Sequence, residues 1–243
     1  MYLFRNPLRY IVEFLFPPAC PLCGAPVDSH GDLCIDCWTA FNWIDGTKCR
    51  HCGYPFMNEY DDAPLCPMCA AGKCEMDLIR SACVYDDASR AAMLPFKHCG
   101  KINYYRFMAR SMIWALRDAD ISPDLVMPVP LANRRLCHRG YNQAALLARP
   151  IAAAFGIPID VDSIGREFRP DMGHKTPQQR AENIHNVFSV RCPDKIRGRK
   201  ILLVDDVMTS GATLYELRRV LMRAGAAEVY GVTFCRVARV VYK

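Results

Sequence analysis

The stretch Ile201-Leu-Leu-Val-Asp-Asp-Val-Met-Thr-Ser-Gly-Ala-Thr213 decides the fold. Its first four residues are apolar, as is typical of a short strand buried on both faces of a parallel sheet. Two adjacent carboxylates follow at the carboxyl end of that strand, where open α/β folds usually bind their ligands. A loop of small residues then leads into a helix. The stretch therefore predicts an α/β domain with a ligand site at this edge of the sheet.

The loop after the two acids has the composition of an anion site. It consists of Thr209, Ser210, Gly211, Ala212 and Thr213. Its backbone N–H groups and hydroxyls suit a phosphate at the N-terminus of a helix. Asp205 and Asp206 beside it suit the hydroxyls of a ribose or a metal-bound water. The sequence contains neither the Walker phosphate-loop motif nor a glycine-rich dinucleotide motif. A Walker-type phosphate loop and a dinucleotide site are therefore both disfavoured.

The rest of the C-terminal part alternates between helical and strand-like segments, as a parallel sheet with helices on both faces does. Helices are expected at residues 103–117, 143–155 and 214–224, and strands at residues 124–129, 201–204 and 228–234. The predicted division is a small N-terminal module over residues 1–80 and a larger α/β domain over residues 81–243.

The small module is defined by its cysteines, because ten of the fourteen precede residue 84. Four C-x-x-C pairs follow one another: Cys20/Cys23, Cys34/Cys37, Cys49/Cys52 and Cys66/Cys69. Two such pairs make a closed tetrahedral Cys₄ zinc site, which is structural because no position is left for a substrate. The repeated C-x-x-C-G at the first and third pairs favours one Zn²⁺ within each half of the module. A cross-braced pairing of the first with the third pair is the alternative, and Cys74 is a spare thiol.

Charge divides the chain in the same place. Residues 1–80 carry 6 basic and 10 acidic side chains, whereas residues 81–243 carry 25 and 15, a net charge of +10. The natural partner of the second part is an anion such as phosphate or nucleic acid, although a solvated basic surface would give the same count. The N-terminal residues predict a short amphipathic helix, and no stretch is apolar for long enough to span a membrane. A cytoplasmic protein is expected, whose paired cysteines bind metal in preference to forming disulfides.

The stretch from residue 201 to residue 213 resembles the PRPP-binding motif of type I phosphoribosyltransferases. That resemblance implies that Asp205 and Asp206 contact the ribose hydroxyls and that the 209–213 loop cradles the 5′-phosphate. It also implies Mg²⁺ bound together with PRPP. The hypoxanthine-type enzymes have an aspartate where this chain has Thr209, so that kind of purine salvage is disfavoured.

A second segment, Pro128-Val-Pro-Leu-Ala-Asn-Arg-Arg-Leu-Cys-His-Arg-Gly-Tyr-Asn-Gln143, resembles the ComF/GntX-like competence-protein family, whose members also carry cysteine ribbons. The segment supplies Arg134, Arg135 and Arg139, which suit a diphosphate at the same sheet edge. Arg139 could instead form a structural pair with a carboxylate. Residues 166–180 are the candidate for a mobile hood over the substrate.

Three functions are compatible with this sequence. The first is Mg²⁺-dependent transfer of a phosphoribosyl group from PRPP to an unidentified acceptor. The second, implied by the ComF resemblance, is handling of single-stranded DNA during uptake, with Tyr104, Tyr105 and Tyr141 as candidate stacking residues unless they belong to the core. The third is a PRPP sensor without catalysis. The acceptor, protein partners and oligomeric state cannot be read from the sequence.

Overall fold

A computed structural model describes residues 16–56, 64–167 and 185–238 of the chain. The expected N-terminal helix and most of the candidate hood lie outside these residues.

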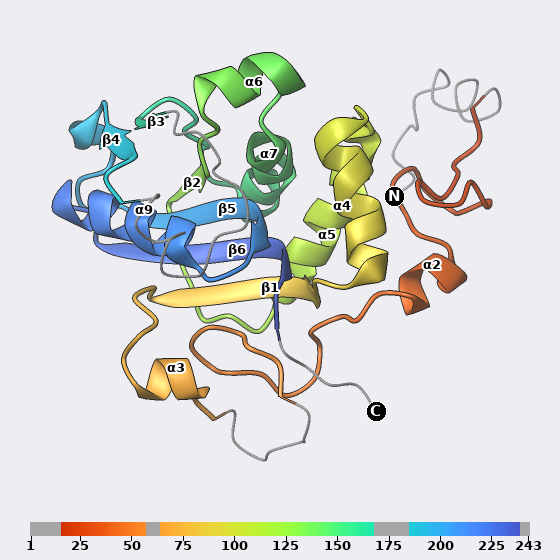
Figure 1. The fold of residues 1–243 in the computed structure, drawn as a ribbon, viewed down its shortest axis with the longest axis horizontal. Helices are drawn as coiled ribbons and strands as arrows, with labels where there is room; N and C mark the ends of the chain where they lie inside the picture. The colour runs from red at the N-terminus through yellow and green to blue at the C-terminus, as the bar shows by residue number, and fades with distance from the viewer. Residues whose placement is uncertain (1–15, 57–63, 168–184, 239–243) are drawn as a thin grey trace, which may run out of the picture.

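The centre of the fold is a four-stranded parallel sheet in the order β1-β6-β5-β2 (Figure 1). The strands are β1 (Leu78–Val84), β6 (Glu228–Arg236), β5 (Lys200–Met208) and β2 (Leu125–Pro128). In the register, Val204 pairs with Pro128 on one side and with Val232 on the other. Because all four strands run in the same direction, their carboxyl ends meet at one edge of the sheet. The predicted parallel α/β architecture is therefore confirmed.

One face of the sheet is covered by three helices. These are α4 (Asp87–His98), α5 (Tyr105–Ala115) and α7 (Gln143–Phe155). Their buried side chains, such as Phe96, Met108 and Ile151, form one core cluster with Leu202 and Phe234 of the sheet. The short 3₁₀ helix η1 (Ile102–Tyr104) leads into α5.

The other face is covered by α9 (Ala212–Arg223) together with part of the cysteine-rich module. Leu214 and Leu217 of α9 join Ile79 and Leu203 of the sheet in a second core cluster, to which Cys49 also belongs. A separate pair of antiparallel strands, β3 (Ile164–Arg166) and β4 (Phe188–Val190), lies beside α9 (Figure 1). Helix α6 (Asn133–Arg139) and the short 3₁₀ helix η2 (Pro193–Lys195) complete the α/β part.

The cysteine-rich module closes the open edge of the sheet at β1. The Ile44 N–H donates to Ala82 O at 2.9 Å, and the Val84 N–H donates to Asn42 O at 2.8 Å. Lys48 also forms an ion pair with Asp118 at 2.6 Å. Covering the unpaired backbone groups of an edge strand protects the sheet from pairing with another chain. The module is therefore integrated into the sheet through backbone hydrogen bonds.

Some of the observed helix and strand boundaries differ from those expected from the sequence. Helix α7 has the expected bounds, but β5 runs on to Met208 because its pairing with β6 continues to Arg236. Strand β1 begins at Leu78, on the N-terminal side of the predicted division at residue 80, and that division stays a prediction. Helix α4 was not expected. None of the helices among the described residues is long and apolar enough to cross a membrane.

Candidate functional site

Asp205 and Asp206 lie within the last residues of β5, at the carboxyl edge of the sheet. The sequence placed them just after a strand, whereas the structure places them inside its paired part. Asp206 is 9% exposed, and its backbone N–H donates to Asp205 Oδ1 at 2.9 Å. Because side chains alternate along a strand, the two carboxylates point to opposite faces at the same edge. The pair can therefore serve ligands on both sides of the strand end.

Lys97, from the last turn of α4, is a site residue that the sequence analysis missed. Its Nζ lies 3.0 Å from Asp206 Oδ2, and both side chains are largely buried. The helix that carries it begins with a capping box, in which Asp86 and Ser89 satisfy each other's backbone N–H groups. That pairing was the available sequence signal, but Pro95 interrupts the helical pattern shortly before Lys97. The lysine gives Asp206 a fixed positive neighbour.

Burial and the negative charge of Asp206 act in the same direction on the pKa of Asp205, and nearby cations oppose them. Burial, and then the charge of Asp206, raise the pKa of Asp205 to about 7, against a smaller opposing effect of Lys97 and Arg166. Arg166 lies in β3, and its Nη1 is 3.4 Å from Pro130 O in the segment after β2. A carboxyl group that changes charge near neutral pH is common at ligand and catalytic sites.

The 209–213 loop connects β5 to α9, as expected. Thr209 and Ser210 are exposed, and Thr213 is half-buried in the first turn of the helix. Gly211 is the N-cap residue with φ of 81°, a conformation that only glycine adopts without strain. A Cβ atom at this position would also stand 2.7 Å from Tyr215 Cζ. The first N–H groups of a helix have no partner within it, so this turn offers donors to an anion.

The three candidate arginines lie on α6, in the segment that follows β2. Arg134 is exposed, and Arg139 is half-buried with its Nη1 3.2 Å from Gln143 Oε1. The partner of Arg139 is thus an amide, where a carboxylate was the alternative. Arg135 belongs to the same helix, but its side chain is not described. Since β2 neighbours β5, this segment leaves the sheet beside Asp205 and Asp206.

Two contacts anchor the end of this segment. The Tyr141 hydroxyl donates to Phe96 O of α4, next to Lys97, and Asn142 Nδ2 donates to Val129 O at 3.1 Å. Tyr141 is therefore held by the fold. Tyr104, another of the aromatic residues considered for stacking on bases, is buried in the core. Tyr105 is half-buried at the start of α5.

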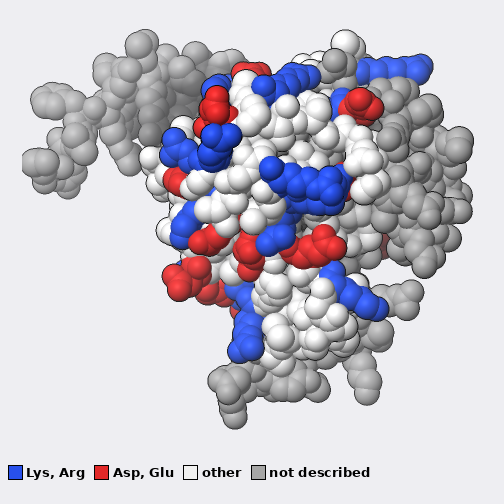
Figure 2. Space-filling view, turned by 90° about the vertical axis from the view of Figure 1, so that its left-hand side faces the viewer, with Lys and Arg blue, Asp and Glu red and all other residues white. Residues whose placement is uncertain are grey.

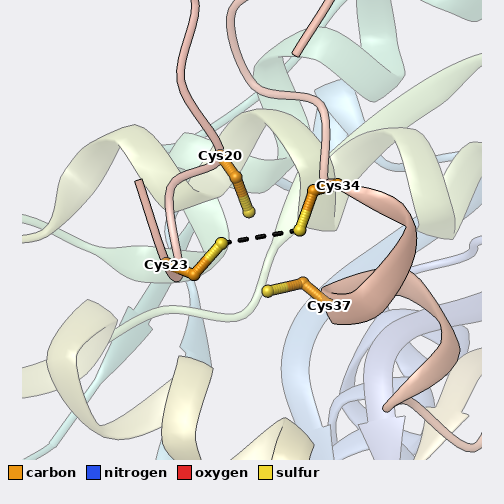
Figure 3. Close-up of side chains that lie close together, drawn as sticks. All are labelled: Cys20, Cys23, Cys34 and Cys37. Atoms are coloured by element: carbon orange, nitrogen blue, oxygen red, sulfur yellow. Dashed lines mark hydrogen bonds between the residues drawn. The ribbon is translucent and has the colours of Figure 1, made fainter. Parts of the chain in front are cut away.

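The eight paired cysteines form two separate clusters, each made of consecutive pairs. Figure 3 shows the first, in which the side chains of Cys20, Cys23, Cys34 and Cys37 point toward a common centre. The second cluster consists of Cys49, Cys52, Cys66 and Cys69. Neither cluster joins the first pair with the third, so the cross-braced alternative is not the arrangement observed.

The geometry of both clusters fits Zn²⁺. The sulfurs of Cys23 and Cys34 are 3.5 Å apart, and those of Cys52 and Cys66 are 3.6 Å apart. Tetrahedral zinc with its usual bonds to sulfur places thiolates about 3.8 Å from one another. In each half, the first cysteine of the second pair is the N-cap of a short helix and the other lies within it, in α2 (Ile35–Thr39) or α3 (Pro67–Ala70). The glycines that follow the first pairs, Gly24 and Gly53, have positive φ, as a tight cysteine turn requires.

Comparison with known proteins assigns both parts of the chain. Residues 11–70 match the double zinc ribbon domain, and residues 140–240 match the phosphoribosyl transferase domain. The DNA utilization protein YhgH of Escherichia coli O157:H7 is 30% identical over 232 residues, which cover 90% of this chain and 97% of that protein. Competence protein F of Haemophilus influenzae is 29% identical, over 74% of this chain and 81% of its own length. Competence protein ComFC of Bacillus subtilis is 26% identical, over 84% of each chain.

Solved structures give only a distant likeness. Adenine phosphoribosyltransferase of Leishmania tarentolae, for example, is 12% identical with a TM-score of 0.38, over 63% of this chain and 90% of that one. The assignment therefore rests on the sequence relatives and on the two matched domains. A double zinc ribbon, a phosphoribosyltransferase-type domain and full-length similarity to these relatives occur together here, and the chain belongs to the ComF-like family.

Proposed function

We propose that this protein binds PRPP with Mg²⁺ and transfers its phosphoribosyl group to an acceptor that is not yet identified. The observation that carries the proposal is the position of Asp205 and Asp206 at the carboxyl end of β5, which leads into the 209–213 loop. The loop binds the 5′-phosphate, and the two carboxylates accept hydrogen bonds from the ribose hydroxyls. Arg134, Arg135 and Arg139 bind the diphosphate. A cytoplasmic location is part of the proposal, since the ribbon thiols must stay reduced to hold zinc.

The proposed reaction breaks the bond between ribose C1 and the diphosphate oxygen, which leaves with the electron pair. The acceptor nucleophile forms a new bond to C1 and loses its proton. Mg²⁺ would neutralise charge on the departing diphosphate when it is bound. The residues of the chain position the ribose and the phosphates, and the arginines stabilise the charge that develops on the leaving group.

Calorimetry with PRPP and Mg²⁺ tests the binding step directly. The wild-type protein should bind, and an Asp205→Asn/Asp206→Asn variant, which keeps the size of both side chains, should not. Release of diphosphate in the presence of candidate acceptors then separates an enzyme from a PRPP sensor. Binding without release for any acceptor would favour the sensor. If the wild-type protein binds no PRPP, the proposed function is wrong.

A role in handling single-stranded DNA is a second proposal, favoured by a relative that is named a DNA utilization protein and by two named competence proteins. The net charge of +10 over residues 81–243 also favours it. However, basic and acidic side chains are interspersed on the face shown in Figure 2, so that face carries no uniform basic field. Binding of an oligonucleotide with strong salt dependence would support this role, and binding that does not weaken with salt would contradict it.

The raised pKa of Asp205 predicts that PRPP binding depends on pH. A protonated Asp205 loses one of its acceptor oxygens, so protons compete with the ligand below a pKa of about 7. Between pH 8 and pH 6 the dissociation constant should rise roughly tenfold. Calorimetry across this range measures the effect, and Asp205→Asn should bind weakly at every pH without this dependence. For stability the sign is the reverse: the raised pKa favours the folded state at acidic pH, and this contribution disappears as the pH rises through 7.

Removing the charge of Lys97 should shift that pH dependence. The ammonium group opposes the rise in the pKa of Asp205, so Lys97→Met should raise this pKa further. The midpoint of PRPP binding should then move to higher pH. Lys101→Met is the matched control, because it removes the same charge from an exposed residue four positions along the chain. Equal midpoints in the two variants would show that the ion pair of Lys97 with Asp206 does not influence the site.

A further inference from the structure

The first turn of the second cysteine cluster lies directly against the sheet. This turn runs from Cys49 to Gly53, and the Ile79 N–H of β1 donates to its His51 O at 3.0 Å. The approach is so close that a Cβ atom added to Gly53 would stand 2.9 Å from Ile79 O. All four thiols of the cluster are buried. A zinc ion bound there would therefore be buried against the strands together with its charge.

That charge is negative, because each cysteine loses its proton when it binds the metal. Four thiolates and one Zn²⁺ leave two negative charges, and burying them is costly unless cations or N–H groups face them. One N–H group does so here, since Cys66 N donates to Cys49 Sγ at 3.3 Å. The first cluster, where Cys23 is exposed, has water for this purpose. The second cluster depends on the side chains around it.

Arg236, the last residue of β6, places a buried cation on this turn. It is 5% exposed, and its Nη1 donates to Cys52 O at 2.5 Å. The guanidinium also lies over the ring of Tyr54, 5.2 Å from the ring centroid. Its Nε is buried and has no hydrogen-bond partner among the described residues, and no acidic residue of that part of the chain forms an ion pair with it. The structure thus holds a buried positive charge without a carboxylate partner beside a cluster that becomes negative with zinc.

Arg80 of β1 contacts the same turn. It is 6% exposed, and its Nη2 donates to Arg50 O at 3.2 Å while its Nη1 lies 3.4 Å from His51 O. Its Nε is 3.6 Å from Asp118 Oδ1, and the other oxygen of that carboxylate pairs with Lys48 Nζ at 2.6 Å. Two cations therefore share one carboxylate at this point, which leaves one positive charge in excess.

We propose that Lys48, Arg80 and Arg236 are the counter-ions of the second zinc site. Three positive charges against the single negative charge of Asp118 leave two, which match the two negative charges of zinc with four thiolates. The two arginines belong to β1 and β6, so the second half of the cysteine-rich module holds its zinc firmly only when it is docked on the sheet. The proposal concerns the metal site and does not depend on PRPP.

Competition with a chelator measures how tightly the second site holds Zn²⁺. In the Cys23→Ser chain the first site is incomplete, so the zinc released comes from the second. Adding Arg236→Met removes the charge and keeps an unbranched side chain. Zinc should then leave at a roughly tenfold lower concentration of chelator, as the loss of one hydrogen bond from a charged group would cause. Arg236→Lys keeps the charge and should recover most of this loss.

Arg219→Met is the matched control, measured in the same Cys23→Ser chain. Arg219 is half-buried and its Nε donates to Glu216 Oε2 at 2.7 Å, so its loss leaves a buried carboxylate unpaired without changing the charge on the Cys49–Gly53 turn. It should lower the temperature of thermal unfolding and leave zinc retention unchanged. If Arg219→Met releases zinc as readily as Arg236→Met, retention follows overall stability and the proposal is overturned.

The lysine variant provides a second way to refute the proposal. Release of zinc from Arg236→Lys at the same chelator concentration as from Arg236→Met would show that the charge at this position does not matter. Should Arg236→Met fail to fold, Lys48→Met carries the same prediction, because its ammonium group belongs to the same three counter-ions and is less deeply buried. Zinc retention equal to that of the Cys23→Ser chain would then overturn the proposal.

Discussion

Cys49→Ser should prevent the whole chain from folding, whereas Cys23→Ser should release zinc and leave the sheet folded. All four thiols of the second cluster are buried, and they share a core cluster with Ile79, Leu203 and Leu214. In the first cluster only Cys20 is buried, whereas Cys23 is exposed and Cys34 and Cys37 are half-buried. A structural zinc ion contributes an apparent 10–16 kcal/mol to folding, roughly as much as the total stability of a domain. At the second cluster this contribution is shared with the core of the sheet, whereas at the first it mainly stabilises the ribbon itself, so the same change should have very different consequences for the sheet.

Zinc content and thermal unfolding measure this difference. The wild-type protein should hold two zinc ions, and Cys23→Ser should hold one while its main cooperative transition moves by only a few degrees, as about 1 kcal/mol would cause. Cys49→Ser should show no cooperative transition. If both variants unfold alike, the two clusters contribute equally to the folding of the sheet, and the expected difference between them is wrong. If the wild-type protein contains no zinc, the clusters are not zinc sites.

The features that the sequence predicted are those that depend on local pattern. The C-x-x-C spacing predicted both clusters, because two thiols in one turn can reach one metal ion. The apolar run at residues 201–204 predicted the central strand, and the apolar pattern ending at Gly156 predicted α7. In each case the determining contacts lie within one segment of the chain, so reading that segment was sufficient.

The features that the sequence did not predict depend on contacts between distant segments. Lys97 reaches Asp206 only because α4 packs beside the carboxyl end of β5, and the helical pattern does not specify that position. The pairing of residues 42–44 with β1 uses backbone groups, which every sequence possesses. Spacing within the sequence carries no information on such contacts.

Gly211→Ala should abolish tight PRPP binding while leaving the protein folded. The alanine would have to adopt φ of 81°, at a cost of about 1 kcal/mol. Its Cβ would also meet Tyr215 Cζ at 2.7 Å, and the ring cannot simply withdraw because Tyr215 packs against the second core cluster. The loop must therefore shift. Losing two hydrogen bonds from its N–H groups to a charged phosphate would weaken binding on the order of a hundredfold.

Gly156→Ala is the control that distinguishes the effect of a displaced loop on binding from the effect of backbone strain. Gly156 ends α7 with φ of 66°, and no atom lies within 4 Å of an added Cβ, so this variant carries the backbone strain without the clash. It should lose a similar amount of stability to thermal unfolding and bind PRPP like the wild-type protein. Calorimetry on the two variants then isolates the contact of Gly211 with Tyr215. Unchanged binding by Gly211→Ala would mean that the phosphate is held elsewhere, and Arg134, exposed on α6 beside the same sheet edge, would become the next residue to substitute.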